Sequence, residues 1–185
     1  MKTNKPNYKW IITVTLSSFL ISLLLGFFTN TIVNDLSVAI SVVVLLMVIC
    51  LGIIFDIIGL AVATSTEAPF HAKSAKKIKG SKESLSLIKN AEKVSSFCND
   101  VIGDIAGVLS GGLAASVAVN VYMSFPVFNA LLINLVFTAI VSSATVGGKA
   151  MGKNFAITKS YMIVETCGII IYNCKKLFIH KKREI

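Results

Sequence analysis

Four long apolar runs restrict what this chain of 185 residues can fold into. A helix rises about 1.5 Å per residue, so roughly 20 apolar residues cross the hydrocarbon core of a membrane. The runs of about that length are Trp10–Phe28, Val38–Ala63, Val101–Val121 and Val127–Val146. Only 15% of the residues are charged, against about a quarter in soluble domains. We therefore expect an all-α membrane protein with four transmembrane helices.

The first run also has features of a secretory signal peptide, because Lys2, Lys5 and Lys9 precede it. It is long for the apolar part of a signal peptide, however. Residues 26–30 (GFFTN) also lack a small-x-small cleavage site. We therefore expect this run to be retained as a transmembrane helix.

The positions of the 18 Lys and Arg residues predict the topology. Three precede the first run, seven lie between the second and third, and eight follow the fourth. The other two loops, Thr29–Ser37 and Tyr122–Pro126, contain none. Because cytoplasmic loops carry the excess of positive charge, we expect a multi-pass protein of the cell membrane with both termini in the cytoplasm. The net charge of +9 then reflects topology and contact with anionic membrane lipid, and we expect no nucleic-acid partner.

The connector between the second and third runs, Pro69–Asp100, predicts two short helices. Gly80-Ser81 indicates the break, with glycine ending one helix and serine capping the next. Apolar residues then recur every three positions from Leu85 to Phe97, which is typical of one amphipathic helix. This cytoplasmic two-helix connector is equally consistent with a solvated hairpin against the membrane and with a regulatory element.

The stretch Ile157–Ile179 is apolar but contains Lys159 and Glu165. If it crossed the membrane, the basic residues after it would lie outside, against the rule that positive charge stays inside. We expect a C-terminal juxtamembrane amphipathic helix, lying at the inner surface or packed around the bundle.

The stretch Phe55–Phe70, FDIIGLAVATSTEAPF, places oxygen-bearing side chains along what we expect to be one helix. Asp56 lies well inside the second run, where an aspartate costs roughly 2.5–3.5 kcal/mol. Runs two to four contain no Lys or Arg, so we expect no buried cationic partner for it. Protonation or a bound cation is the expected compensation, and Thr64, Thr66 and Glu67 would add further oxygen ligands.

Simpler interpretations of these carboxylates remain open. Glu67 and Asp104 lie near the ends of their runs, where such residues often cap a helix or are hydrated. Asp56 is also consistent with a structural, protonated carboxyl group.

The third run carries a ridge of small residues, Gly103, Gly107, Gly111 and Ala115, at four-residue spacing. Small residues let helix backbones approach closely inside a membrane. The ridge predicts tight packing, either within the chain or against a second copy.

The histidine and cysteine residues show no spacing that is typical of a catalytic or metal-binding site. The two histidines, His71 and His180, lie in basic segments, and no nucleophile-base arrangement is visible, so we expect no enzyme. The four cysteines lack metal-binding spacing and are interpreted as small apolar packers.

The order of several short motifs resembles the transmembrane domain of the CorB/CorC (cyclin M) magnesium and cobalt transporter family. Thr64–Ala68, TSTEA, is similar to that family's S-G-S-E-T-A, and Ala91-Glu92-Lys93 is similar to its P-E-R-F. Gly103-Asp104 corresponds to a G-N pair, and Gly148–Ala156, GKAMGKNFA, to G-E-x-x-P-K-x-x-A. The resemblance covers roughly residues 38–156.

This resemblance implies a divalent cation transporter-like protein that binds or moves Mg²⁺ or cobalt. The metal site that it implies is Thr64, Thr66, Glu67, Gly103 and Asp104. We add Asp56 to this set, because a carboxylate inside an apolar run calls for a compensating cation. The family domain is a dimer with a juxtamembrane helix around the bundle, which implies a homodimer. The resulting domain prediction is a tail, extra helix and outer loop at 1–37, a CorB/CorC-like domain at 38–156, and a juxtamembrane helix and basic tail at 157–185.

Departures from the family pattern favour a second interpretation, a non-transporting membrane scaffold or partner subunit that retains the fold. Lys149 stands where the family motif has an acidic residue, and Gly152 where it has proline. Only about thirty residues follow the last motif, so we expect the family's cytosolic nucleotide-sensing domains to be absent.

Overall fold

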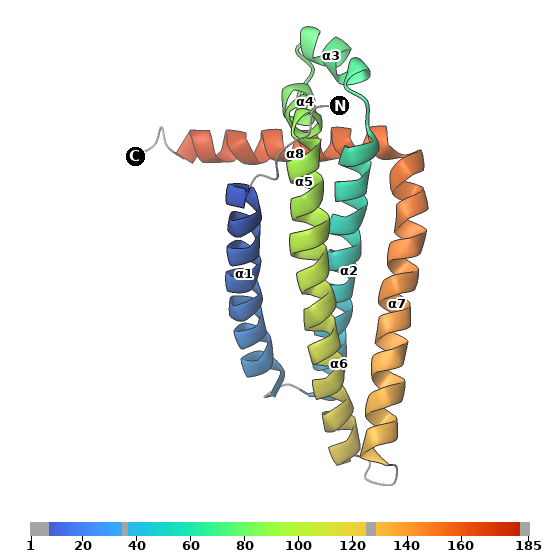
Figure 1. Cartoon of the computed structure of the whole chain (residues 1–185). Coiled ribbons are helices and arrows are strands. Elements are labelled where there is room, and N and C mark those ends of the chain that lie inside the picture. The colour runs from blue at the N-terminus through green and yellow to red at the C-terminus, as the bar shows by residue number, and fades with distance from the viewer. Residues whose placement is uncertain (1–7, 35–36, 125–128, 182–185) are drawn as a thin grey trace. The chain divides into compact units, whose positions relative to one another are not determined.

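The computed structural model describes residues 8–34, 37–124 and 129–181, and every regular element in those residues is a helix (Figure 1). This confirms the all-α class. In chain order the helices are α1 (Tyr8–Asn34), α2 (Val38–Thr64), α3 (Ala68–Ala75), α4 (Ser81–Lys89), α5 (Ala91–Ser96), the π-helix η1 (Phe97–Gly103), α6 (Asp104–Ser124), α7 (Ala130–Thr158) and α8 (Ser160–Lys181).

Within the described residues, three helical segments are long and apolar enough to cross a membrane: Val38–Thr64, Ala91–Met123 and Ala130–Thr158. They contain most of the second, third and fourth predicted runs and are compatible with a membrane protein. The apolar part of α1, Ile11–Phe27, is shorter, so a fourth span stays a prediction. The start of the fourth run at Val127 lies outside the described residues, as do parts of both outer loops and the last basic residues.

The chain forms two compact units, and their boundary falls inside α2, η1 and α7. The first unit comprises the described residues of Met1–Ile53 and Asp100–Gly148. In it, the first part of α2 packs with α6 and α7, and α1 lies along α6. Its buried core is Leu45, Ile49, Leu113, Ala114 and Val141.

Two residues of the small-residue ridge on α6, Gly107 and Gly111, have open space beside them inside this unit. A Cβ atom at Gly107 or Gly111 would meet nothing within 4 Å in the described part of the chain. The tight contact lies elsewhere, because a Cβ at Gly52 of α2 would come within 2.9 Å of the Cβ of Ala106. The face of α6 at Gly107 and Gly111 is therefore left open by this chain's described residues.

The second unit, Ile54–Asn99 with Lys149–Ile185, contains the end of α2, the connector, the end of α7, and α8. Figure 1 shows α8 running across the ends of α2 and α7 instead of continuing α7. Only Lys159 separates α7 from α8. The buried core of this unit is Ala61, Val62, Phe70, Ile88, Ala156 and Val164, so all of its parts share one apolar cluster.

The connector differs in two details from the sequence prediction. The amphipathic stripe is not one helix, because α4 ends at Lys89 and Asn90 separates it from α5. Ser81 does not cap α4: its hydroxyl donates to the carbonyl oxygen of Ile78 at 2.6 Å, and Gly80 occupies the cap position with a φ of 78°. A positive φ favours glycine, so the break itself is where the sequence places it.

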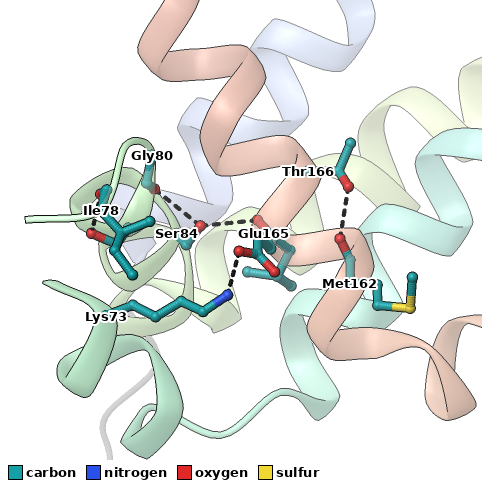
Figure 2. A network of polar contacts seen from close by, with 9 residues as sticks. Lys73, Ile78, Gly80, Ser84, Met162, Glu165 and Thr166 are labelled. Carbon is teal, nitrogen blue, oxygen red and sulfur yellow. Dashed lines mark hydrogen bonds and ion pairs between the residues drawn. The ribbon is translucent and has the colours of Figure 1, made fainter. Parts of the chain in front are cut away.

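The start of α4, with Gly80 and Ser84, lies directly against α8 (Figure 2), and the contact has a glycine on each side. A Cβ at Gly80 would come within 2.7 Å of the backbone nitrogen of Ile169, and one at Gly168 within 2.6 Å of the carbonyl oxygen of Gly80. The buried hydroxyl of Ser84 lies 3.1 Å from the carbonyl oxygens of both Gly80 and Val164. This close contact, the α4–α8 junction, fixes the connector to α8.

A charged pair supports the junction from α3. The ammonium of Lys73 donates to the carboxylate of Glu165 on α8 (Figure 2) and lies 4.9 Å from the ring centre of Tyr161. The hydrogen bond to Glu165 is the main cause that raises the pKa of Lys73 above its ordinary value, followed by the hydrogen bond to Tyr161. The pair therefore ties α3 to the same helix that holds α4.

This raised pKa predicts a pH-dependent contribution to stability. The pair contributes fully below the unfolded-state pKa of about 10.4 and loses its contribution as the pH rises through the folded-state pKa. We expect Lys73→Gln to lower the melting temperature at pH 8, and the difference from the original protein to shrink once the pH rises past the ordinary lysine pKa of about 10.4. Melting curves in detergent from pH 8 upward measure this difference, with Lys89→Gln, a change at an exposed residue, as the control. A difference that stays constant with pH would contradict this role of Lys73.

Candidate functional site

Asp56 has a cationic partner, which corrects the sequence prediction. Its Oδ1 lies 3.9 Å from the ammonium nitrogen of Lys149, and both side chains are mostly buried, at 13% and 23% exposure. The prediction was wrong because the fourth apolar run stops at Val146 by hydropathy, whereas α7 continues to Thr158. The helix thereby carries Lys149 to the level of Asp56.

The oxygen-rich segment after Asp56 is not one helix. α2 ends at Thr64, so Thr66 and Glu67 lie beyond it and Glu67 immediately precedes α3. The hydroxyl of Thr64 donates to the carbonyl oxygen of Leu60 at 2.9 Å. Asp56 and Thr64 are eight residues apart, about 12 Å along the helix axis, and ligands of Mg²⁺ lie about 2 Å from the ion. One ion therefore cannot contact both side chains directly.

Glu67 occupies the cap position of α3 but makes no side-chain capping bond. Its carboxylate instead lies 3.1 Å from Nε2 of His71, one turn later, and both side chains are about half exposed. The exposed Thr66 lies beside it. These residues form an exposed polar edge at the end of α2.

Gly103 and Asp104 belong to the other compact unit. Gly103 is buried and closes the π-helix η1, and Asp104 is the exposed first residue of α6. π-helical turns within longer helices often occur at functional sites. The backbone irregularity thus coincides with the predicted Gly-Asp pair.

Two buried oxygens have no hydrogen-bond partner among the described residues: Ser65 Oγ and Asn99 Oδ1. Ser65 lies between the predicted Thr64 and Thr66, and Asn99 lies in η1. Asn99 faces Gly59 closely, because a Cβ at Gly59 would come within 2.8 Å of the Asn99 Cγ. Gly59 is three residues after Asp56, so both lie on one face of α2.

Sequence reasoning missed Asn99 and the role of Lys149. A signal for Lys149 was present, because intramembrane carboxylates usually pair with another charged group. A glycine at position 59 is ambiguous in sequence, and its close approach to η1 depends on how two distant segments pack. Nothing in the spacing of Asn99 indicated that its oxygen would be buried.

The described residues contain no group of three or more His, Cys, Asp and Glu side chains placed to hold a metal ion. The oxygens identified above are mostly amide and hydroxyl groups, with Asp56 as the buried carboxylate. Comparison with known proteins finds no matching family model, curated protein or solved structure.

Proposed function

We propose that this protein is a multipass membrane protein that binds and transports a divalent cation, magnesium or cobalt. The observation that carries the proposal is the mostly buried Asp56 within the apolar α2, held 3.9 Å from Lys149. A carboxylate at such a position generally marks an ion path. The ammonium of Lys149 then acts as a tethered cation that an arriving ion displaces.

The polar groups around this pair support an ion path more than a single closed site. Asp56 forms one position. Thr64, about 12 Å further along α2, forms a second, exposed position together with Thr66 and Glu67, which lie beyond the end of that helix. Hard cations accept oxygen ligands and Mg²⁺ usually keeps several waters. The unpartnered oxygens of Ser65 and Asn99 are acceptors that a partly hydrated ion would satisfy. The family resemblance adds Gly103 and Asp104 as further proposed ligands, which belong to the other compact unit.

The proposed topology has α1 as an additional transmembrane helix, with both termini, the connector and α8 on the cytoplasmic side. The proposed assembly is a homodimer, in which a second copy covers the open face of α6 at Gly107 and Gly111. Small residues at such a face permit close helix contact in a membrane. The run of α8 across the ends of α2 and α7 (Figure 1) supports the CorB/CorC-like arrangement expected from the motifs.

A non-transporting scaffold or partner subunit is the second candidate, and the same ion pair favours it. Lys149 satisfies Asp56 without any added cation, so the pair could serve only to hold α2 and α7 together. In that case the charges would be structural.

Flux into proteoliposomes separates the two functions. Reconstituted protein with a magnesium-sensitive dye inside the vesicles should give a saturable signal when Mg²⁺ is added outside. Asp56→Asn and Asp104→Ala should each reduce this signal at least roughly tenfold. A tenfold reduction corresponds to a loss of about 1.4 kcal/mol of ion binding. Lys153→Gln is the matched control, because this exposed residue on α7 is outside the proposed path. No flux from the original protein, with intact folding, would favour the scaffold.

A further inference from the structure

We propose that the corner between α2, α7 and α8 binds one anionic phospholipid, with its acyl chain in an apolar groove and its phosphate at Lys159. The groove has a volume of about 520 Å³, within the usual range for ligand sites. It is lined by residues of all three helices, among them Ile54, Ile57, Phe155, Lys159, Met162 and Ile170. All of them belong to one compact unit.

The chemistry of the lining fits an acyl chain. Most of the lining side chains are aliphatic or aromatic, and the hydroxyl of Thr166 donates to the carbonyl oxygen of Met162 at 2.8 Å (Figure 2). A polar soluble ligand would require several convergent polar groups, which this lining does not supply. Phe155, Met162 and Ile170 are each more than half exposed, so the groove offers apolar surface for an occupant to cover.

The charge of the groove selects a negative headgroup. Lys159 is the one charged residue among those that line it, and its side chain is exposed. The carboxylate of α8, Glu165, is bound to Lys73 at the α4–α8 junction. Basic residues at the membrane surface attract anionic lipid, and basic pockets between helices on the cytoplasmic side bind anionic headgroups.

The positions along the helices match the depth of a lipid. Lys159 directly follows Thr158, the last residue of a candidate span, which is where a phosphate would lie. Ile54–Ile58 precede the end of α2 at Thr64 by six to ten residues, or roughly 9–15 Å. The ammonium of Lys159 thus lies at the level of the lipid headgroups. The apolar lining extends from it toward the membrane interior, as an acyl chain does.

One side of α8 packs against α4, and the opposite side lines the groove. Val164 and Gly168 lie four residues apart and face α4, whereas Met162, Thr166 and Ile170 repeat at the same spacing along the groove. The two sets are offset by two residues, roughly half a helical turn. The helix is therefore held by the connector on one side and open to a lipid on the other.

The test is native mass spectrometry of the full chain released from nanodiscs of equal parts phosphatidylglycerol and phosphatidylcholine. We expect one retained phosphatidylglycerol per chain, and a fall in that retention of at least roughly fivefold for Lys159→Gln. Lys153→Gln, an exposed lysine on α7 that does not line the groove, should leave it unchanged. Ile170→Trp, which fills the groove while keeping the charge, should lower retention of both lipids.

Several results would overturn the proposal. Equal retention of the two lipids by the original protein would remove the headgroup preference, and unchanged phosphatidylglycerol retention in both groove variants would place the lipid elsewhere. Binding of soluble glycerol 3-phosphate with similar affinity would show that a phosphate alone is recognised. Cys167 also lines the groove. A disulfide between the Cys167 residues of two copies would show that a second copy, and not a lipid, covers the groove.

Discussion

Replacing Gly168 with alanine should separate the connector from α8 and destabilise the protein by about 2–3 kcal/mol, at the upper end of the usual cost of overpacking. A Cβ at this position would come within 2.6 Å of the carbonyl oxygen of Gly80 and 2.9 Å of the backbone nitrogen of Ser84. Both are backbone atoms, so no side-chain rotation relieves the contact. The free energy of unfolding in mixed micelles measures the effect.

Two variants sharpen this experiment. Gly147→Ala on α7 is the matched control, because its Cβ would meet nothing within 4 Å in the described residues, and we expect no loss of stability. Ser84→Ala combined with Gly168→Ala should not restore stability, because the obstructing backbone atoms remain. A full recovery in the double variant would show that the Ser84 hydroxyl, and not the backbone atoms, obstructs the added methyl group.

Breaking the ion pair of α2 and α7 should have the second large effect. Lys149→Gln leaves the mostly buried Asp56 without this ammonium, and we expect a loss of about 1–3 kcal/mol in the absence of divalent cations. Asp56→Asn should cost a similar amount, because it leaves the lysine without the carboxylate. The double variant Asp56→Asn, Lys149→Gln should lose less free energy of unfolding than the two single variants lose together, by about 1–2 kcal/mol.

Additive losses in this double-mutant cycle would contradict a direct interaction between the two side chains. The exposed Lys153→Gln, one turn further along α7, serves as the control for removing a lysine from this helix. Its pairing with Asp56→Asn should be additive, since residues without a shared contact rarely couple.

The sequence predicted the helical class because apolar runs of transmembrane length admit few alternatives. The break at Gly80 and a helix near Ile157–Ile179 were also visible, since a glycine turn and a shift in charge are local signals. The division at Asn90 was not, because an apolar stripe at three-residue spacing continues across it. The π-helix η1 has no local signal, since its extra residue per turn depends on how its neighbours pack.

The candidate site was less predictable than the fold. Asp56 was identified because a carboxylate in an apolar run is costly wherever the chain goes. Lys149 was misjudged because hydropathy ended the fourth run at Val146, whereas helix geometry continued α7 through two glycines. The same local reasoning placed Glu67 on α2, although α2 ends three residues earlier. Contacts between distant helices, as at Gly59 and Asn99, lay beyond what spacing along one chain can indicate.

The most direct test of the proposed cation path is the magnesium dependence of thermal stability for the original protein, Lys149→Gln and Asp56→Asn in detergent. If Lys149 occupies the place of an ion, Lys149→Gln should be stabilised by Mg²⁺ at a concentration roughly tenfold lower than the original protein requires, a change of about 1.4 kcal/mol in binding. Asp56→Asn should show no saturable stabilisation. The same midpoint in all three proteins, or no effect of magnesium on any of them, would contradict a cation site at Asp56.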